Sequence, residues 1–525
     1  MNEDVTRFSA PKTFTGVVGA GVANAAQRWV NDSRPGIELP GEERLLSDFA
    51  QELGAALTAA ELFRRGDKIV ATLTRDKRGL RPVDPEEFRT LTEKHVRCYR
   101  SKPPKNNEVA TVAVHRTMST DDARGVMQSP QFLDLLRTVE QVNDVPLPVL
   151  RADGAIELLA PGYDHASATL TLHAGKYEAA SLNQARKEID QLFAEFAFAD
   201  ARSKGVAVAA MLTLFASGLM PSASLRPAFV YIANAPGAGK TICADCAVVP
   251  VLGRSYRTPP PEREEEMQKT LLSAVIAAQP VIFFDNMRRH VSSSSLEALL
   301  TSPHFSGRVL SASQMFSGEN RSTVFITGNG CTVSQDIERR ALFVELFSEH
   351  ARPEDRVYSQ RLSEVELIGR RWRLLGALWA FVRHWDENGR PEPSKTRAGY
   401  EPWCDTIGAI VEAAGFGCPV EKAQLRDGGD TDRADFVQLV LVLHAEQEFA
   451  RLDFSGVVTI AAKHGLFERG IGDGEGLDRS TKARFAKYLA RHDAIVFPGT
   501  PSLRFCIEGK GHQRTYRVEV VKGRD

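Results

Sequence analysis

The stretch "NAPGAGKT", from Asn234 to Thr241, constrains the fold of this 525-residue chain more than any other segment. A β-rich run, "AFVYIAN", leads into it, and "TICADCAVV" can continue from it as a helix. A glycine-rich turn between a strand and a helix can wrap a phosphate in backbone N–H groups, while a lysine neutralises the phosphate oxygens and a hydroxyl holds Mg²⁺. Gly237, Gly239, Lys240 and Thr241 supply these parts. The sequence therefore predicts a phosphate-binding loop.

This loop departs from the usual pattern at its first position, where Asn234 stands in place of a glycine. Asparagine adopts left-handed backbone angles more readily than other non-glycine residues, so we expect the loop to bind nucleotide despite the substitution. ATP and Mg²⁺ are the cofactors that such a loop implies. The predicted nucleotide contacts are Asn234, Ala235, Pro236, Gly237, Ala238, Gly239, Lys240, Thr241 and Ile242.

A second strand, "PVIFFDN", ends in Asp285 and Asn286. Because a buried parallel strand ends at the same edge as the phosphate loop, we expect Asp285 to bind Mg²⁺ together with Thr241. Hydrolysis also needs a group that orients or deprotonates the attacking water. Asn286 cannot act as a base, so either it orients the water, or Glu266 of the segment "PEREEEMQK" supplies the base.

A third strand, "STVFITGNG", ends with Asn329, whose side chain could hydrogen-bond the γ-phosphate or its attacking water. Arg339 and Arg340 then precede another strand in "SQDIERRALFVEL". Adjacent arginines are usually surface charge, but an arginine at a subunit boundary can stabilise transition-state charge on a neighbour's phosphate. The candidate catalytic residues are therefore Lys240, Asp285, Asn286, Asn329, Arg339 and Arg340.

Strands and helices alternate between residues 191 and 348, which predicts an α/β core with a parallel sheet. We expect an N-terminal α+β domain at 1–190, with a DNA-binding or ring-forming role, and the ATPase core at 191–348. A helical lid at 349–432 and a C-terminal DNA-binding domain at 433–525, with a strand pair around Gly509, complete the expected organisation. A hydrophobic content of 43% is enough for several cores.

Several features indicate a cytoplasmic protein without a membrane partner. The longest uncharged run, from Gly205 to Leu225, contains small and polar residues and Pro221, which favours a buried helix over a membrane span. The chain starts with an acidic, polar segment where a signal peptide would be apolar, and its seven cysteines show no repeating spacing. Cys243 and Cys246 form the only close pair, and we expect them to pack in a helix rather than bind metal.

The C-terminal tail is the basic part of a chain whose net charge is −1, with 11 Lys and Arg against 5 Asp and Glu from Leu477 to Asp525. In "TKARFAKYLARH", Phe485 and Leu489 are predicted to face a core, while basic residues share another face. A solvated surface helix has this pattern too, but the basic hairpin that follows favours a winged-helix module on DNA. The candidate DNA contacts are Arg484, Lys487 and Arg491 in the helix and Lys510, His512, Arg514 and Arg517 in the hairpin.

In order and spacing, "NAPGAGKT", "VIFFDN", "ITGNG" and "DIERR" resemble the AAA+ ATPase module of replicative helicases encoded by phages, plasmids and integrated mobile elements. This family is related to the minichromosome-maintenance type and includes the C-terminal modules of primase-helicases. Flanking segments at Val145–Asp164 and Gly399–Phe416 are similar to segments around the ATPase in these proteins, so the resemblance covers roughly 145–416. The chain departs from the family at Asn234 and in "TGNG", where a second asparagine is common.

The resemblance implies that Lys240 is the loop lysine, Thr241 its hydroxyl, Asp285 the Mg²⁺ aspartate, Asn329 the sensor asparagine, and Arg340 or Arg339 the arginine finger. It also implies a homo-hexameric ring, and a hairpin in "HFSGRVLSASQMFSGENRSTVF", with residues 311–320 at its tip, that reaches into the central channel. Arg308 and Arg321 flank the turn of this hairpin and are either phosphate contacts or exposed charges at strand ends. Arg370 and Arg371 are candidates for the sensor arginine of the lid.

The sequence thus predicts an ATP-dependent DNA helicase that translocates on single-stranded or forked DNA as an oligomeric ring. Acidic residues in the N-terminal region show no DxD-type spacing with strand context, so priming would come from a separate primase or another replication protein. One alternative is an ATP-switched, DNA-binding initiator or helicase loader that does not unwind DNA. Another is a defence or signalling AAA+ ATPase whose tail binds protein.

Overall fold

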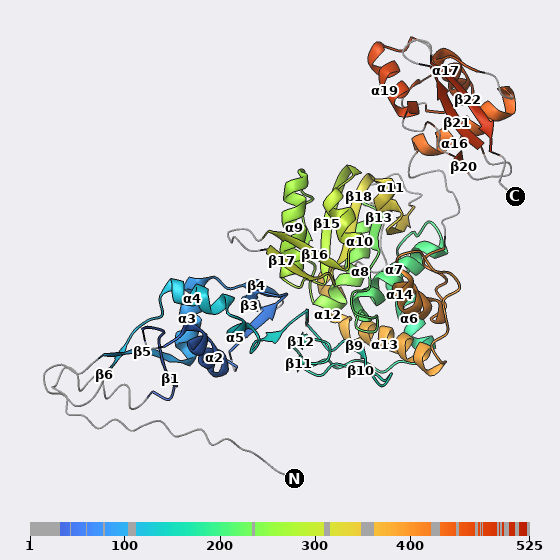
Figure 1. Ribbon diagram of the computed structural model, residues 1–525. Helices are drawn as coiled ribbons and strands as arrows, with labels where there is room; N and C mark the ends of the chain where they lie inside the picture. The colour runs from blue at the N-terminus through green and yellow to red at the C-terminus, as the bar shows by residue number, and fades with distance from the viewer. Residues whose placement is uncertain are drawn as a thin grey trace.

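The computed structural model describes most of the chain, and Figure 1 traces it from the blue N-terminal part to the red C-terminal part. The described residues are 32–42, 44–58, 60–76, 79–102, 112–233, 237–308, 315–347, 362–421, 431–447, 451–467, 471–472, 474, 476–490, 493, 496–497, 503–509 and 514–521.

The N-terminal part combines two small sheets with short helices. A four-stranded sheet has the order β4-β3-β2-β7, and a three-stranded sheet has the order β1-β5-β6. Asp84 caps α3 by accepting a hydrogen bond from the backbone N–H of Glu87, and Pro85 takes the first helical position, which fixes where this helix begins. The elements are β1 (Gly36–Glu38), α2 (Leu46–Ala56), β2 (Leu62–Arg65), β3 (Ile69–Leu73), β4 (Leu80–Pro82), α3 (Pro85–His95), β5 (Arg97–Lys102), β6 (Val112–His115), α4 (Thr120–Gln128), α5 (Pro130–Leu133) and β7 (Arg137–Thr138).

Short strands then connect this part to the central sheet. β12 pairs with β11 antiparallel and with β8 parallel, while β9 and β10 form an antiparallel pair. The bounds are β8 (Gln141–Asn143), β9 (Pro148–Leu150), β10 (Ile156–Leu158), β11 (Gly162–Asp164) and β12 (Thr169–Thr171). The next helix, α6 (Leu182–Phe193), runs across the expected domain boundary at 190, and the domain boundaries stay predictions.

The central sheet confirms the predicted α/β class, because its five strands are all parallel in the order β14-β15-β18-β13-β19. Figure 1 shows helices on both sides of this sheet. Its elements are α7 (Ala201–Phe215), β13 (Ala228–Ala233), α8 (Lys240–Leu252), β14 (Arg257–Thr258), α9 (Glu264–Ile276), β15 (Val281–Val291), α10 (Ser294–Thr301), β18 (Thr323–Val333), α11 (Gln335–Glu338) and β19 (Ala341–Leu346).

Alternate residues of each central strand enter different cores, as the twofold repeat of a strand requires. In β13, Phe229 and Tyr231 belong to a core that also contains α7 and α8. Ala228 and Val230 belong to the core on the other face, which contains α9 and α10. The first part of the uncharged run predicted as a buried helix lies in α7, which is buried along most of its length, but the helix ends at Phe215 and the run continues to Leu225 without it.

Strands β15 and β18 are longer than the sequence predicts. Asp285 and Asn286 were expected at the end of a strand, but β15 continues to Val291, and its register against β18 shifts between Phe284 and Met287. Asn329 likewise lies inside β18, opposite Arg288 of β15, rather than at a strand end. A bulge therefore interrupts β15 where its functional candidates lie.

The predicted hairpin before β18 is confirmed as an antiparallel pair of β16 (His304–Arg308) and β17 (Met315–Glu319). Its tip is shorter than expected, because Met315–Glu319 forms a strand and Asn320 is buried at the hairpin base. The side-chain amide of Asn320 donates to the carbonyl of Leu299, 2.8 Å away, which fixes this base against α10.

A helical region follows the central sheet. Its elements are α12 (Glu364–Gly369), α13 (Arg371–Glu387), α14 (Glu401–Trp403), the π-helix η2 (Cys404–Gly408) and α15 (Ala409–Ala413). Trp403 is 0% exposed, and its indole Nε1 donates to the hydroxyl of Thr213 in α7, 2.9 Å away. This helical region therefore shares the core of α7 and α8.

Among its described residues, the C-terminal part has its own core, built from three helices and a three-stranded sheet in the order β20-β21-β22. The predicted hairpin corresponds to the antiparallel pair β21 and β22, and β20, which the sequence did not predict, pairs with β21. The elements are α16 (Thr431–Gln447), α17 (Phe454–Lys463), α19 (Arg479–Ala490), β20 (Val496–Phe497), β21 (Leu503–Glu508) and β22 (Thr515–Val520).

Candidate functional site

The predicted phosphate-binding loop joins β13 to the N-terminus of α8. Gly237 and Gly239 have φ angles of +76° and +86°, in the region that favours glycine. A Cβ atom on Gly239 would also come within 3.3 Å of the Phe196 ring. Asn234, Ala235 and Pro236 lie outside the described residues. The described part of the loop therefore has the geometry that places free helix N–H groups at the end of a parallel strand.

Lys240 opens α8 and is 8% exposed. Burial lowers the pKa of its ammonium below the ordinary value, and the charge of Asp285 opposes this shift. Ala238, Thr241 and Ile242 are half-buried around it. A lysine ammonium at a helix N-terminus is placed where an anionic phosphate would be stabilised by both groups.

Thr241 and Asp285 meet beside this lysine, although 44 residues separate them. The Thr241 hydroxyl donates to Asp285 Oδ1 over 2.9 Å. A hydroxyl and a carboxylate in contact are the oxygen donors that a Mg²⁺ ion takes beside nucleotide phosphates. The two residues assigned to the metal by sequence are thus brought together, at a place where Mg²⁺ could bind.

The bulge in β15 has a third partner that the sequence did not reveal. The Thr327 hydroxyl, from β18, donates to Asp285 Oδ1 over 2.5 Å and accepts the backbone N–H of Asn286 over 2.9 Å. Asn286 has a φ angle of +60° and is exposed, so the bulge turns it away from the core. The "TG" in "ITGNG" was the only available signal, because a threonine two residues before a polar strand position faces the same side of the sheet.

The positions of Asn329 and Glu266 give less information about catalysis. β18 lies between β15 and β13, so the backbone of Asn329 runs between the Asp285 strand and the loop strand, but its side chain is outside the described part. Glu266 is exposed on α9 and forms an ion pair with Lys269, 2.9 Å away. The choice between Asn286 and Glu266 in handling the attacking water stays open.

Arg339 and Arg340 lie at the opposite edge of the sheet from the phosphate loop of their own chain. The carbonyl of Arg340 accepts the backbone N–H of Ala228, the first residue of β13, whereas the loop follows the last. The length of β13, about 17 Å, separates the two positions. Both side chains pair with Asp336 and lower the pKa of its carboxyl, Arg339 being the larger cause. These arginines could therefore reach a nucleotide only in another chain.

The two arginines predicted to flank the hairpin turn, Arg308 and Arg321, differ in exposure and in their contacts. Arg308 ends β16 and is exposed. Arg321 lies beyond the base of the hairpin rather than at its turn, pairs with Glu319 over 2.8 Å and donates to the carbonyl of Ser167 over 3.4 Å. Its side chain is only 20% exposed, so neither expectation for Arg321, a free strand-end charge or an open phosphate contact, matches this geometry.

In the C-terminal part, Phe485 and Leu489 are buried as predicted, while Arg484 and Lys487 are exposed on α19. Arg514 is exposed before β22, but Arg517 is paired with both Glu508 and Glu519, which offsets its charge. Arg491, Lys510 and His512 lie outside the described residues.

The two arginines that were candidates for the sensor of the lid form ion pairs with other residues. Arg370 is 8% exposed and pairs with Glu188 over 2.7 Å. Arg371 pairs with Asp144 and donates to the carbonyl of Pro250, near the C-terminal end of α8. That end is about 15 Å from Lys240 along the helix, so Arg371 is not at the phosphate loop.

The close cysteine pair lies inside a helix, as expected. Cys243 and Cys246 are buried in α8, where burial raises the pKa of both thiols, and no group of three or more His, Cys, Asp or Glu is arranged to hold a metal in the part of the chain described. Among the described helices, none has the length and apolar character needed to cross a bilayer.

Comparison with known proteins finds a weak structural similarity. No protein-family model matches the chain, and no curated protein matches it. Among solved structures, the chain is similar to the apo A form of the C-terminal region of NrS-1, with a TM-score of 0.38 and 10% identity, over 90% of this chain and 99% of that one. A likeness this weak supports no assignment.

Proposed function

We propose that this chain is an ATP-dependent, Mg²⁺-requiring DNA helicase of the AAA+ class, which works as a homo-oligomeric ring, with six subunits by family resemblance. The observation that carries the ATPase assignment is the contact between Thr241 and Asp285 beside the buried Lys240 at the start of α8. Bound ATP would supply the scissile phosphoanhydride, and Mg²⁺ would polarise it. The loop N–H groups and Lys240 would hold the phosphates, while Thr241 and Asp285 would hold the metal.

The ring is supported by the position of the arginine candidates. Because Arg339 and Arg340 lie across the sheet from their own loop, they could complete a nucleotide site only when two chains associate head to tail. A head-to-tail interface that repeats and closes produces a ring. Hydrolysis in such a ring depends on assembly, since each site contains residues of two subunits.

The DNA assignment is supported by exposed cations at two places. Arg308 lies at the end of β16, where the hairpin leads toward its tip, and Arg484 and Lys487 share the exposed face of α19. The helix α19 followed by the β21–β22 hairpin supports a winged-helix assignment for the C-terminal part. Single-stranded or forked DNA is the proposed substrate, and a separate primase or other replication protein is the proposed partner.

The test is steady-state ATPase activity with and without single-stranded DNA, alongside unwinding of a forked duplex. Lys240→Ala and Arg340→Ala should each abolish DNA-stimulated turnover. Mixing the two inactive variants should restore part of the activity, because about a quarter of the interfaces in a randomly mixed ring would join an intact Lys240 to an intact Arg340. Lys395→Ala, at an exposed ion pair with Glu421 over 2.6 Å, is the matched control and should behave as wild type.

Each other outcome selects a different function. Salt-sensitive DNA binding and ATP turnover without strand separation would indicate an initiator or loader. Turnover that is indifferent to DNA would contradict the helicase proposal and indicate a signalling or defence ATPase. Failure of the mixture to regain activity would contradict the shared site.

A further inference from the structure

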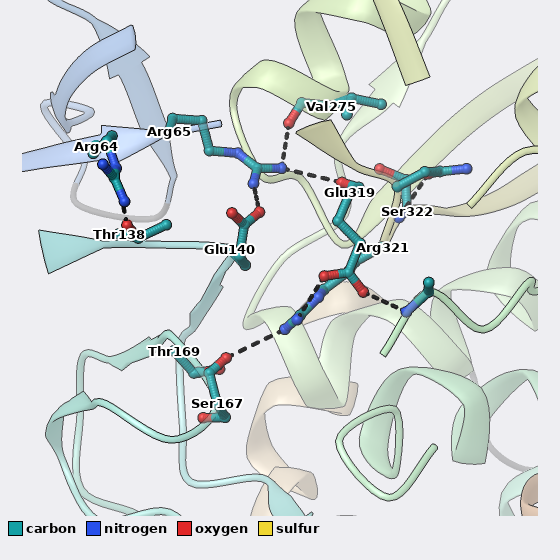
Figure 2. Close-up of polar contacts among 12 residues, drawn as sticks. Arg64, Arg65, Thr138, Glu140, Ser167, Thr169, Val275, Glu319, Arg321 and Ser322 are labelled. Carbon is teal, nitrogen blue, oxygen red and sulfur yellow. Dashed lines mark hydrogen bonds and ion pairs between the residues drawn. The ribbon is translucent and has the colours of Figure 1, made fainter. Parts of the chain in front are cut away.

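Arg65, the last residue of β2, carries a guanidinium group that is buried far from the nucleotide site. Its side chain is 1% exposed, and Figure 2 shows it reaching from the N-terminal sheet into the central part of the molecule. Nη2 donates to the carbonyl oxygens of Val275, 2.8 Å away, and Glu319, 3.4 Å away, while Nη1 pairs with the Glu140 carboxylate. The Phe316 ring lies 5.9 Å from the guanidinium carbon. One side chain thus links β2 to the end of α9 and to the hairpin strand β17.

This burial is energetically unfavourable for a cation. Desolvation and, to a smaller extent, the positive charge of Arg321 lower the pKa of Arg65 to about 10. An apolar side chain would fill the same space without that penalty. What an apolar residue cannot do is bridge a carboxylate and two carbonyl groups at fixed angles, which the planar guanidinium does. The contacts of Arg65 therefore indicate that it positions the elements it joins.

Gly66, the next residue in the β2–β3 turn, lies directly against the hairpin. Gly66 has a φ angle of +57°, and a Cβ atom there would lie 2.6 Å from the carbonyl oxygen of Ser317 and 3.0 Å from the Phe316 ring. Real Cβ atoms do not approach backbone oxygens this closely, so the β2–β3 turn and β17 touch where only glycine fits.

Residues at the C-terminal end of β17 also hold the hairpin in place. The Glu319 carboxylate accepts the backbone N–H of Ala223, 2.7 Å away, and pairs with Arg321, which in turn donates to the Ser167 carbonyl (Figure 2). Phe305 and Phe316 of the hairpin share one hydrophobic core with Phe63 of β2. The hairpin base therefore packs against the N-terminal sheet as well as against the central part of the molecule.

We propose that Arg65 is a positioning residue that clamps the base of the β16–β17 hairpin to the N-terminal sheet and to the end of α9. Val275 of α9 is ten residues before Asp285, so the clamp connects the hairpin to the segment that leads into the metal-binding candidate of β15. The N-terminal sheet, the hairpin base and α9 then move as one body during ATP turnover. The consequence for DNA depends on the proposed function, but the clamp itself does not.

The primary test is amide hydrogen exchange in the full-length protein, comparing Arg65→Lys with Arg64→Lys. Arg64 is the adjacent residue of β2 and makes comparable bonds, to Thr138 over 3.1 Å and Asp134 over 2.9 Å, but at the surface. A lysine at 65 keeps the charge but cannot reach all three acceptors. Exchange in 304–308 and 315–319 should rise about tenfold in Arg65→Lys and stay unchanged in Arg64→Lys. Equal exchange in the two variants would overturn the proposal.

A second variant covers the case in which Arg65→Lys unfolds the N-terminal sheet. Gly66→Ala should also speed exchange in the hairpin, because its Cβ would displace Ser317. Gly154→Ala is the control, since Gly154 has a φ angle of +88° and open space around the position of its Cβ. If hairpin exchange in Gly66→Ala does not exceed that in Gly154→Ala, the clamp is refuted.

The functional readout separates this inference from the proposed function. Arg65→Lys should leave ATP turnover without DNA within about twofold of wild type while reducing the stimulation by single-stranded DNA about tenfold. If wild type shows no DNA stimulation, the helicase proposal fails, while the exchange result still decides whether the clamp exists. Stimulation that stays at the wild-type level in a variant with a loosened hairpin would show that the clamp does not couple the hairpin to ATP turnover.

Discussion

The hydroxyl of Thr327 should control the nucleotide site, because it joins Asp285 to the backbone of Asn286 across the bulge in β15. Thr327→Val removes a hydrogen bond to a carboxylate, worth about 1.5–3 kcal/mol, and leaves the N–H of Asn286 without its acceptor, worth about 1 kcal/mol. If about half of this sum is lost in the transition state, kcat falls about tenfold to thirtyfold. Thr327→Ser should keep most of the activity.

The assay is steady-state ATPase activity over a Mg²⁺ titration, with thermal unfolding measured in parallel. The half-saturating Mg²⁺ concentration should rise in Thr327→Val, since Asp285 is no longer held by a second hydroxyl. Thr323→Val is the matched control, because Thr323 is 1% exposed in the same strand and no contact of its hydroxyl joins it to Asp285. The reasoning fails if Thr327→Val keeps kcat within twofold and an unchanged Mg²⁺ dependence while Thr323→Val does the same.

Two further predictions concern charge. Replacing Arg484 and Lys487 with alanine should weaken DNA binding at low salt, measured by fluorescence titration. The slope of log K against log salt should fall by about 1 per lost phosphate contact. Lys463 is already paired with Glu446 over 3.0 Å, so Lys463→Ala should leave this slope unchanged. The lowered pKa of Lys240 means that its ammonium loses a proton at a lower pH than an exposed lysine does. Nucleotide affinity should therefore fall as pH rises toward 10, with proton uptake on binding in that range by calorimetry. Lys240→Arg should bind with little pH dependence, and an equally steep decline in that variant would contradict the assignment.

Local patterns in the sequence account for much of the central architecture. Four apolar residues before Asp285, and the apolar run before Asn234, predict buried strands because a parallel sheet covered on both faces needs continuous hydrophobic residues. The glycines of the loop predict the strand-to-helix turn for steric reasons that are local. These features depend only on residues that are close together in the chain, so they can be predicted from a single sequence.

What could not be predicted depends on distant partners. β15 extends past Asp285 through "MRRHV", a polar segment that becomes a strand only because β18 lies beside it. Thr327 acts on residues 41 and 42 positions away, and its place two residues before Asn329 in the strand does not identify those partners. Arg321 is an ordinary strand-end charge in the sequence, and only the fold brings it to Ser167, 154 residues earlier.

Trp403 gives the molecule a built-in optical signal. Its indole is fully buried, is hydrogen-bonded to Thr213 in α7, and lies 6.4 Å from the Phe229 ring in β13, the strand that leads to the phosphate loop. Fluorescence from an indole in such dry surroundings shifts to longer wavelength once water reaches the ring. Any separation of the helical region from α7 would therefore redden the emission of Trp403. Stopped-flow fluorescence of a variant in which Trp403 is the only one of the chain's five tryptophans to remain could then time that separation against each round of nucleotide binding and release.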